Sequence, residues 1–223
     1  MKKKLVWALI LVIIFSLIGC SPSESTETKT DGDVIKIGVF EPMTGANAAG
    51  GAMEVEGVKL ANKLYPEVLG KKVELVIVDN KSDKVEAANA ATRLVDKEKV
   101  NAIIGSWGSS FSMAAGPIVM DGKVPAVGAS CTNPLVTIGN DYYFRVCFID
   151  SFQGVVMANY AFNKEGAKKA AIIQEISNDY SVGLAKFFTD EFKKLTGDEN
   201  AIVAVANYNT GDQDFTAQLQ TVA

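Results

Sequence analysis

From Val34 to the end of the chain, short β-branched and apolar runs alternate with segments of helical periodicity. The runs predict strands at residues 34–40, 73–78, 102–104, 125–127, 143–146, 170–174 and 201–206. Apolar residues three or four positions apart predict helices after Gly50 and Gly51 and at residues 83–95, 113–120, 151–165 and 181–195. Strands separated by helices of about 10–15 residues indicate βαβ units, so we expect an α/β fold with parallel sheets covered on both faces.

The first 33 residues carry a different pattern. Three lysines precede an apolar run of about 15 residues, too short for a span of roughly 20, so residues 1–19 predict a secretory signal peptide. The sequence Leu17-Ile18-Gly19-Cys20 resembles a bacterial lipobox, which implies that Cys20 is lipidated; a plain signal peptide and a single anchor helix are the alternatives. Residues 20–33 lack large apolar side chains and predict a flexible tether. We therefore expect a membrane lipoprotein on the extracytoplasmic face, at the cell surface or in the periplasm.

The composition excludes several classes of function. The chain has no histidine, which removes Ser-His-Asp and Cys-His catalysis and the commonest zinc sites. Residues 1–19 hold three lysines and no acid; removing them leaves 19 basic against 26 acidic residues and moves the formal charge from −4 to −7. An acidic domain is a poor partner for nucleic acid, and we expect no nucleic acid, cofactor or metal. Cys131 and Cys147 are either a disulfide or two free thiols.

Loops of small polar residues follow three of the predicted strands. They span residues 41–51, 105–110 and 128–134. In open parallel sheets, ligands bind outside the carboxyl ends of the strands. Backbone N–H groups, hydroxyls and helix N-termini at that edge favour a small anionic group such as a carboxylate. We expect the ligand site there, although a single loop of this composition is often an ordinary connector.

Enzymatic motifs are weak. Gly105–Ser109 resembles a nucleophile elbow, but its glycines are displaced and no histidine can take the proton. Neither a G-x-G-x-x-G motif nor a phosphate-binding P-loop follows the first strand. Asp79 ends the second strand, and without a glycine fingerprint we expect it to cap a turn. We therefore expect a protein that is not an enzyme.

Several short motifs occur in a fixed order from Val34 onward. They are Ile35–Val39 with Pro42–Gly45, Val78–Asn80, Ala87–Val95, Ile103–Gly105 with Ser109-Ser110, Thr132–Pro134, Phe144-Arg145, Asp150-Ser151 with Gln153-Gly154, and Asn178–Tyr180 with Gly183. Each motif is loose alone, but the ordered set is specific. It resembles the branched-chain amino-acid (leucine/isoleucine/valine-type) binding proteins, the extracytoplasmic receptors of ABC importers, which have the periplasmic-binding-protein type I fold.

The resemblance implies two Rossmann-like α/β lobes that close on a ligand, one at residues 34–150 and one at residues 151–223. It also implies that the chain delivers an amino acid to an ABC permease. The segment 215–223 predicts a helix with no strand after it, so we expect a truncated second lobe and weak or absent ligand binding by a chain that ends there.

The resemblance assigns roles residue by residue. Ser109 would bind the ligand α-carboxylate, the Ser130 backbone carbonyl would accept from the α-ammonium, and the Thr132 hydroxyl would reach both groups. Tyr180 would cover the ligand on closure, and Trp107 would line the pocket.

Two departures from the family pattern leave the ligand open. Many relatives carry a tyrosine in the first loop, where this chain has Ala49-Gly50, so we expect a more open or differently shaped pocket. The resemblance also implies an acidic residue in the second lobe that binds the ligand ammonium, and we expect it in the part of that lobe that this chain lacks. Other amino acids, short amides and aromatic acids remain alternatives, as do a sensory module of the same fold and, from another class, a secreted α/β hydrolase or transferase.

Overall fold

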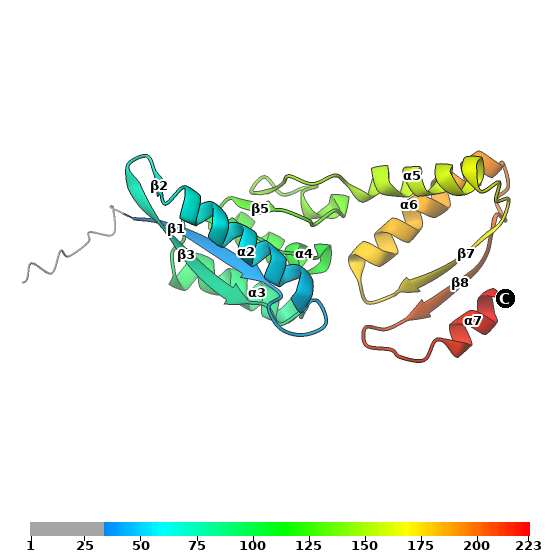
Figure 1. The fold of residues 1–223 in the computed structure, drawn as a ribbon, viewed down its shortest axis with the longest axis horizontal. Helices are drawn as coiled ribbons and strands as arrows, with labels where there is room; N and C mark the ends of the chain where they lie inside the picture. Colours follow the sequence, from blue (N-terminus) through cyan, green and yellow to red (C-terminus); the bar gives the residue numbers. More distant parts are fainter. Residues whose placement is uncertain (1–33) are drawn as a thin grey trace, which may run out of the picture. The chain divides into compact units, whose positions relative to one another are not determined.

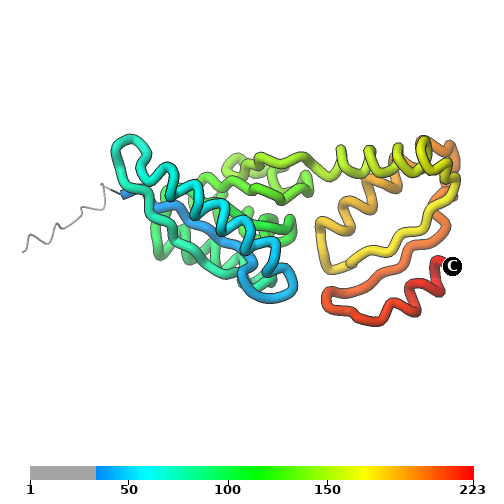
Figure 2. Tube along the Cα trace, in the orientation of Figure 1, coloured from blue at the N-terminus to red at the C-terminus, as the bar shows by residue number. Residues whose placement is uncertain are grey.

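The computed structural model describes residues 34–223, and the predicted signal peptide, tether and lipidation site at Cys20 lie outside these residues. Within them, the α/β prediction is confirmed, with two separate sheets whose helices follow the strands in alternation (Figure 1). Figure 2 traces the chain from the first sheet, whose last strand ends at Arg145, into the second, whose first strand begins at Ala170.

The first sheet has six strands in the order β2-β3-β1-β4-β5-β6. Their bounds are β1 Val34–Glu41, β2 Glu67–Val68, β3 Lys71–Asp79, β4 Ala102–Ile104, β5 Ala126–Gly128 and β6 Tyr143–Arg145. Neighbouring strands are parallel except β2 and β3, a short antiparallel pair that the sequence analysis did not predict. Because β1 lies between β3 and β4, the carboxyl ends of β1 and β4 meet at a topological switch point, where open α/β sheets bind ligands.

Helix α2 (Ala48–Leu64) packs on one face of this sheet, and α3 (Lys84–Thr92) and α4 (Ser109–Gly122) pack together on the other (Figure 1). Side chains along β1 alternate between the faces, so Phe40 joins the α3–α4 core while Glu41 points toward α2. The buried core on the α3–α4 side comprises Phe40, Ala87, Ala90, Ala91, Leu94, Ile103, Phe111, Ala115 and Val119, with further residues around them.

Helix α2 corrects one prediction. Gly50 and Gly51 were expected to precede the helix, but both are buried inside it. A Cβ atom at Gly51 would lie 2.2 Å from the Pro42 carbonyl oxygen, so the first turn approaches the preceding loop at a distance that only glycine permits. Close packing, and not helix breaking, explains these glycines. The helix buries Val55 but leaves Leu64 exposed, so its apolar residues do not all face the core.

Helix α3 begins as its sequence predicts. The Asp83 carboxylate accepts hydrogen bonds from the N–H groups of Val85 and Glu86 at 2.7 and 2.9 Å. Such an N-cap contributes about 1 kcal/mol to helix stability. The helix continues as a π-helical turn at Arg93–Lys97, which buries Leu94.

The second sheet pairs β7 (Ala170–Glu175) with β8 (Ile202–Tyr208) in parallel. Helices α5 (Asp150–Asn159) and α6 (Asp179–Thr196) pack against each other, and α7 (Thr216–Val222) contacts β8. Their small core contains Ala158, Phe192 and Ala201. Between residues 34 and 223, no helix combines the length and apolarity needed to cross a bilayer.

Two further helices begin earlier than predicted, and both starts carry expected site residues. Helix α4 starts at Ser109, and α6 starts at Asp179, where Asn178 accepts from the N–H of Tyr180 at 3.1 Å. Ser109 and Tyr180 therefore lie in first helical turns, not in loops. Glycine and serine before α4, and asparagine and aspartate at the start of α6, have low helix propensity, so the sequence pattern indicated connecting loops at both starts.

Candidate functional site

A cavity of about 290 Å³ lies at the carboxyl ends of β4 and β5 and reaches the elements of the second sheet. It is lined by Trp107, Gly108, Ser109, Ser130, Thr132, Phe148, Gln153, Asn178 and Tyr180. All five residues that the sequence analysis selected for ligand binding border this one space. The resemblance placed them together, and the described fold brings them together.

Ser109 is the first residue of α4 and is 1% exposed. Its hydroxyl oxygen accepts a hydrogen bond from the N–H of Asn133 at 3.0 Å, which leaves the hydroxyl proton to be donated. Thr132 is also buried, and its carbonyl oxygen accepts from the N–H of Asp150 at 2.9 Å. A helix N-terminus with hydroxyl donors around it favours an anionic group such as a carboxylate.

Ser130 lies after β5, and its hydroxyl donates to Glu54 of α2. The Ser130 side chain is therefore bound to Glu54, which leaves the Ser130 backbone as the group expected to contact a ligand.

Trp107 lies between β4 and α4 and borders two cavities. Its backbone N–H donates to Oε2 of Glu41 at 2.6 Å, and its indole packs on Gly50. The indole fills the space beside Gly50 of α2.

Tyr180 comes from the second sheet's elements. Its hydroxyl oxygen accepts a hydrogen bond from Nε2 of Gln153 at 3.2 Å. Gln153, Phe148 and Asn178 also line the cavity, although the sequence analysis did not select them as site residues. Gln153 and Asn178 belong to motifs that carry the family resemblance, and these motifs could have identified them as site residues. No sequence motif pointed to Phe148.

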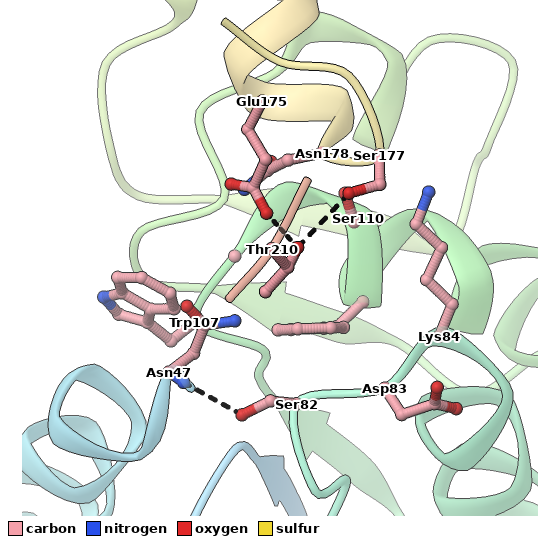
Figure 3. A pocket seen from close by; sticks show the side chains of 12 residues that line it. Asn47, Ser82, Asp83, Lys84, Trp107, Ser110, Glu175, Ser177, Asn178 and Thr210 are labelled. Carbon is pink, nitrogen blue, oxygen red and sulfur yellow. Dashed lines mark hydrogen bonds between the residues drawn. The ribbon is translucent and has the colours of Figure 1, made fainter. Parts of the chain in front are cut away.

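A second cavity, of about 350 Å³, shares Trp107, Gly108 and Asn178 with the first. Figure 3 shows its polar lining, with the Thr210 hydroxyl between Glu175 and Ser177 on one side and Ser82 beside Asn47 on the other. The shared residues make the two cavities neighbours.

Asp179 connects α6 to the first sheet's elements. Its N–H donates to Oγ of Ser110 at 2.9 Å, its carbonyl accepts from Nδ2 of Asn133 at 2.9 Å, and its carboxylate pairs with Nζ of Lys84 at 2.7 Å. Burial raises the pKa of Asp179, but the hydrogen bonds from Lys84 and Ser110 and the lysine charge outweigh it, and the pKa is lowered. These contacts hold the start of α6 beside the cavity.

One buried carboxyl group beside the cavity, that of Glu41, was missed by the sequence analysis. Glu41 is fully buried at the end of β1, and burial, followed by the charge of Glu54, raises its pKa to about 9. Hydrogen bonds from Trp107 and Ser106 oppose this shift only partly. An acidic residue at the end of a buried β-branched run was the signal available in the sequence.

Asp79 and the two cysteines also have structural outcomes. Asp79 caps a turn as expected, accepting from the N–H groups of Met43 and Lys81, each at 2.8 Å. Cys131 and Cys147 are both free, and burial raises the pKa of the Cys131 thiol to about 11. Within residues 34–223, no cluster of acidic and cysteine side chains has the makeup of a metal site.

Several known proteins resemble this chain in sequence and fold. A protein named "Amino acid binding protein" from Pseudomonas aeruginosa is 34% identical, a match that covers 97% of this chain and 56% of that protein. A leucine binding protein, LivK, from Thermotoga maritima is 48% identical with a TM-score of 0.78, and the match covers 83% of this chain and 52% of that one.

A third relative is the branched-chain amino acid transporter substrate binding protein LivJ from Streptococcus pneumoniae, solved with isoleucine. It is 37% identical with a TM-score of 0.75, over 84% of this chain and 53% of that one. This chain thus spans about half the length of the proteins it matches. Residues 34–223 match the family described as "Periplasmic binding protein", and the chain belongs to that family.

Proposed function

We propose that this chain belongs to a lipid-anchored, extracytoplasmic solute-binding protein of an ABC importer, which captures an amino acid of branched-chain type or a close relative. The observation that carries the proposal is the convergence of Ser109, Ser130 and Thr132 with Tyr180 on one cavity. The named relatives that bind leucine or isoleucine support the same ligand class.

The polarity of the site suits a zwitterion. The start of α4 and the hydroxyl groups of Ser109 and Thr132 provide donors for a carboxylate, and the Ser130 carbonyl provides an acceptor for an ammonium. None of these groups must change protonation to bind, which agrees with a chain that has no histidine. The proposed activity is reversible binding, with no bond made or broken in the ligand.

The cavity size also suits a small metabolite. Ligand pockets range over about 300–1,000 Å³, and 290 Å³ lies at the lower limit. Phe148, Tyr180 and Trp107 add apolar surface for an aliphatic side chain.

Calorimetry on the full-length protein with the common amino acids tests this proposal. Saturable binding of leucine, isoleucine or valine, with the ligand recovered unchanged, is the expected result. Absence of binding across the whole amino-acid panel, or conversion of a ligand, contradicts it. Thr92→Val removes an exposed hydroxyl on α3 that bonds only within its helix, and this variant should bind like the wild type.

A further inference from the structure

Glu41 and Glu54 lie side by side behind the cavity wall, and each uses one oxygen to hold a cavity residue. Oε2 of Glu41 accepts from the Trp107 N–H at 2.6 Å and from the Ser106 hydroxyl at 3.4 Å. Oε1 of Glu54 accepts from the Ser130 hydroxyl. The two carboxyl groups therefore touch the loops that follow β4 and β5.

The other oxygen of each group is buried and has no hydrogen bond. These atoms are Oε1 of Glu41 and Oε2 of Glu54. Two ionised carboxylates offer only acceptors, so neither can satisfy the other, and both would leave a buried acceptor unpaired. One proton placed between the two oxygens gives both a partner.

The surroundings offer no cation in place of that proton. Among the described residues, neither Glu41 nor Glu54 forms an ion pair with a lysine or arginine. The titratable groups nearby are Tyr143, whose hydroxyl donates to the Gly105 carbonyl at 2.5 Å, and Cys147. The guanidinium of Arg145 donates its hydrogen bonds elsewhere, to the carbonyls of Cys131, Asn133 and Pro134 and to the Thr137 hydroxyl.

We propose that Glu41 and Glu54 share one proton between Oε1 of Glu41 and Oε2 of Glu54, and that this pair positions Trp107 and Ser130 at the cavity. The hydrogen bonds then run from the Trp107 N–H to Glu41, from the Glu41 carboxyl proton to Glu54, and from the Ser130 hydroxyl to Glu54. This series of hydrogen bonds joins β1, α2 and the loops after β4 and β5, and it carries a single negative charge. Only the effect of the Glu41–Glu54 pair on ligand affinity rests on the proposed function.

The pair makes folding sensitive to pH between about 4.5 and about 9, and the cavity sensitive to pH near 9. Burial and the charge of Glu54 raise the pKa of Glu41 to about 9. A carboxyl whose pKa rises on folding contributes stability that is full below its ordinary pKa and is lost as pH rises through the folded value. The contribution therefore declines from about pH 4.5 to about pH 9, where the two carboxylates come to repel each other.

Carbon-13 NMR of the glutamate side-chain carboxyl carbons in the full chain tests the shared proton without any ligand. One resonance should titrate near pH 9 and vanish in Glu41→Gln, which keeps the shape and offers an amide donor to Glu54. Glutamate resonances that all titrate between pH 4 and 5, or a high-pH titration that survives Glu41→Gln, overturn the proposal. If Glu41→Gln fails to fold, Glu54→Gln serves: it should move the high-pH titration downward, and an unmoved midpoint overturns the pairing.

Ligand affinity measured against pH tests the positioning role separately. The ratio of wild-type to Glu41→Gln affinity cancels the titration of the ligand itself, and it should fall up to about ten-fold between pH 8 and pH 10. If this affinity ratio stays constant while the NMR titration is as expected, the positioning of Trp107 and Ser130 is rejected but the shared proton is retained. Absence of ligand binding at every pH, with the NMR result intact, rejects the proposed function alone.

Discussion

The indole of Trp107 lies directly on Gly50, the third residue of α2. A Cβ atom at Gly50 would lie 2.3 Å from Cε2 and 2.5 Å from Nε1 of Trp107, far inside van der Waals contact. Because Trp107 also borders both cavities, the absence of a side chain at Gly50 sets where the wall of the candidate site stands.

Gly50→Ala should therefore displace the Trp107 indole. We expect a loss of about 1–3 kcal/mol in the free energy of unfolding, as is typical of overpacking, together with weaker ligand binding. Chemical denaturation and calorimetry measure the two effects. Gly57→Ala is the matched control in the same helix: a Cβ atom there meets nothing within 4 Å, and the change should stabilise the helix by up to about 1 kcal/mol. Equal effects of the two substitutions would contradict the contact.

Asp79→Asn should loosen the loop that follows β1. The Asp79 carboxylate accepts from the N–H groups of Met43, Thr44 and Lys81 and from the Thr44 hydroxyl at 2.6 Å. Asparagine keeps one oxygen for the N–H groups but loses the charge and the acceptor of the Thr44 hydroxyl, and this should cost about 1–2 kcal/mol in the free energy of unfolding at pH 7. Asp141→Asn, at an exposed position, is the control and should change little.

The same carboxylate predicts a pH dependence. Burial raises the pKa of Asp79, but its hydrogen bonds from Thr44, Lys81 and Met43 outweigh burial, and the pKa is lowered. A lowered pKa means stability that is present above the ordinary aspartate value of about 4 and is lost as pH falls through the folded value. The stability difference between wild type and Asp79→Asn should therefore shrink below about pH 4. A difference that stays constant down to pH 2 would argue against this role.

Tyr180→Ala should weaken ligand binding mainly through faster dissociation. The side chain reaches the cavity from α6 and bonds to Gln153, so its removal opens the cavity on the side of the second sheet. We expect a ten-fold or larger rise in the dissociation rate, measured by stopped-flow or surface plasmon resonance. Tyr65→Ala, at a residue that is 72% exposed, should leave the rate as it is. An unchanged rate in Tyr180→Ala would remove Tyr180 from the site.

Much of the fold was predictable because β-branched runs such as Val34–Phe40 and Ala170–Gln174 have few alternatives to a strand. The helix starts at Ala48, Ser109 and Asp179 were not predicted, because their small or capping residues resemble loops until tertiary contacts fix them. The strand pair β2–β3 was missed because two residues, Glu67 and Val68, give no periodicity.

For the site, the resemblance placed Ser109, Ser130, Thr132, Tyr180 and Trp107 around one cavity, while their ligand roles stay predictions. The pairing of Glu41 with Glu54 could not be predicted, because 13 positions separate them and nothing in the local pattern shows that both face the space between β1 and α2. Likewise, the indole of Trp107 meets Gly50 only after β1, α2 and β4 have assembled.

The most direct test of the account is the dissociation constant of the full-length protein for its amino-acid ligand after Ser109→Ala and Thr132→Val. If these hydroxyl groups bind the carboxylate, each substitution should weaken binding by about ten-fold or more, while Thr92→Val should not. Dissociation constants that stay at the wild-type value in both variants would contradict the account.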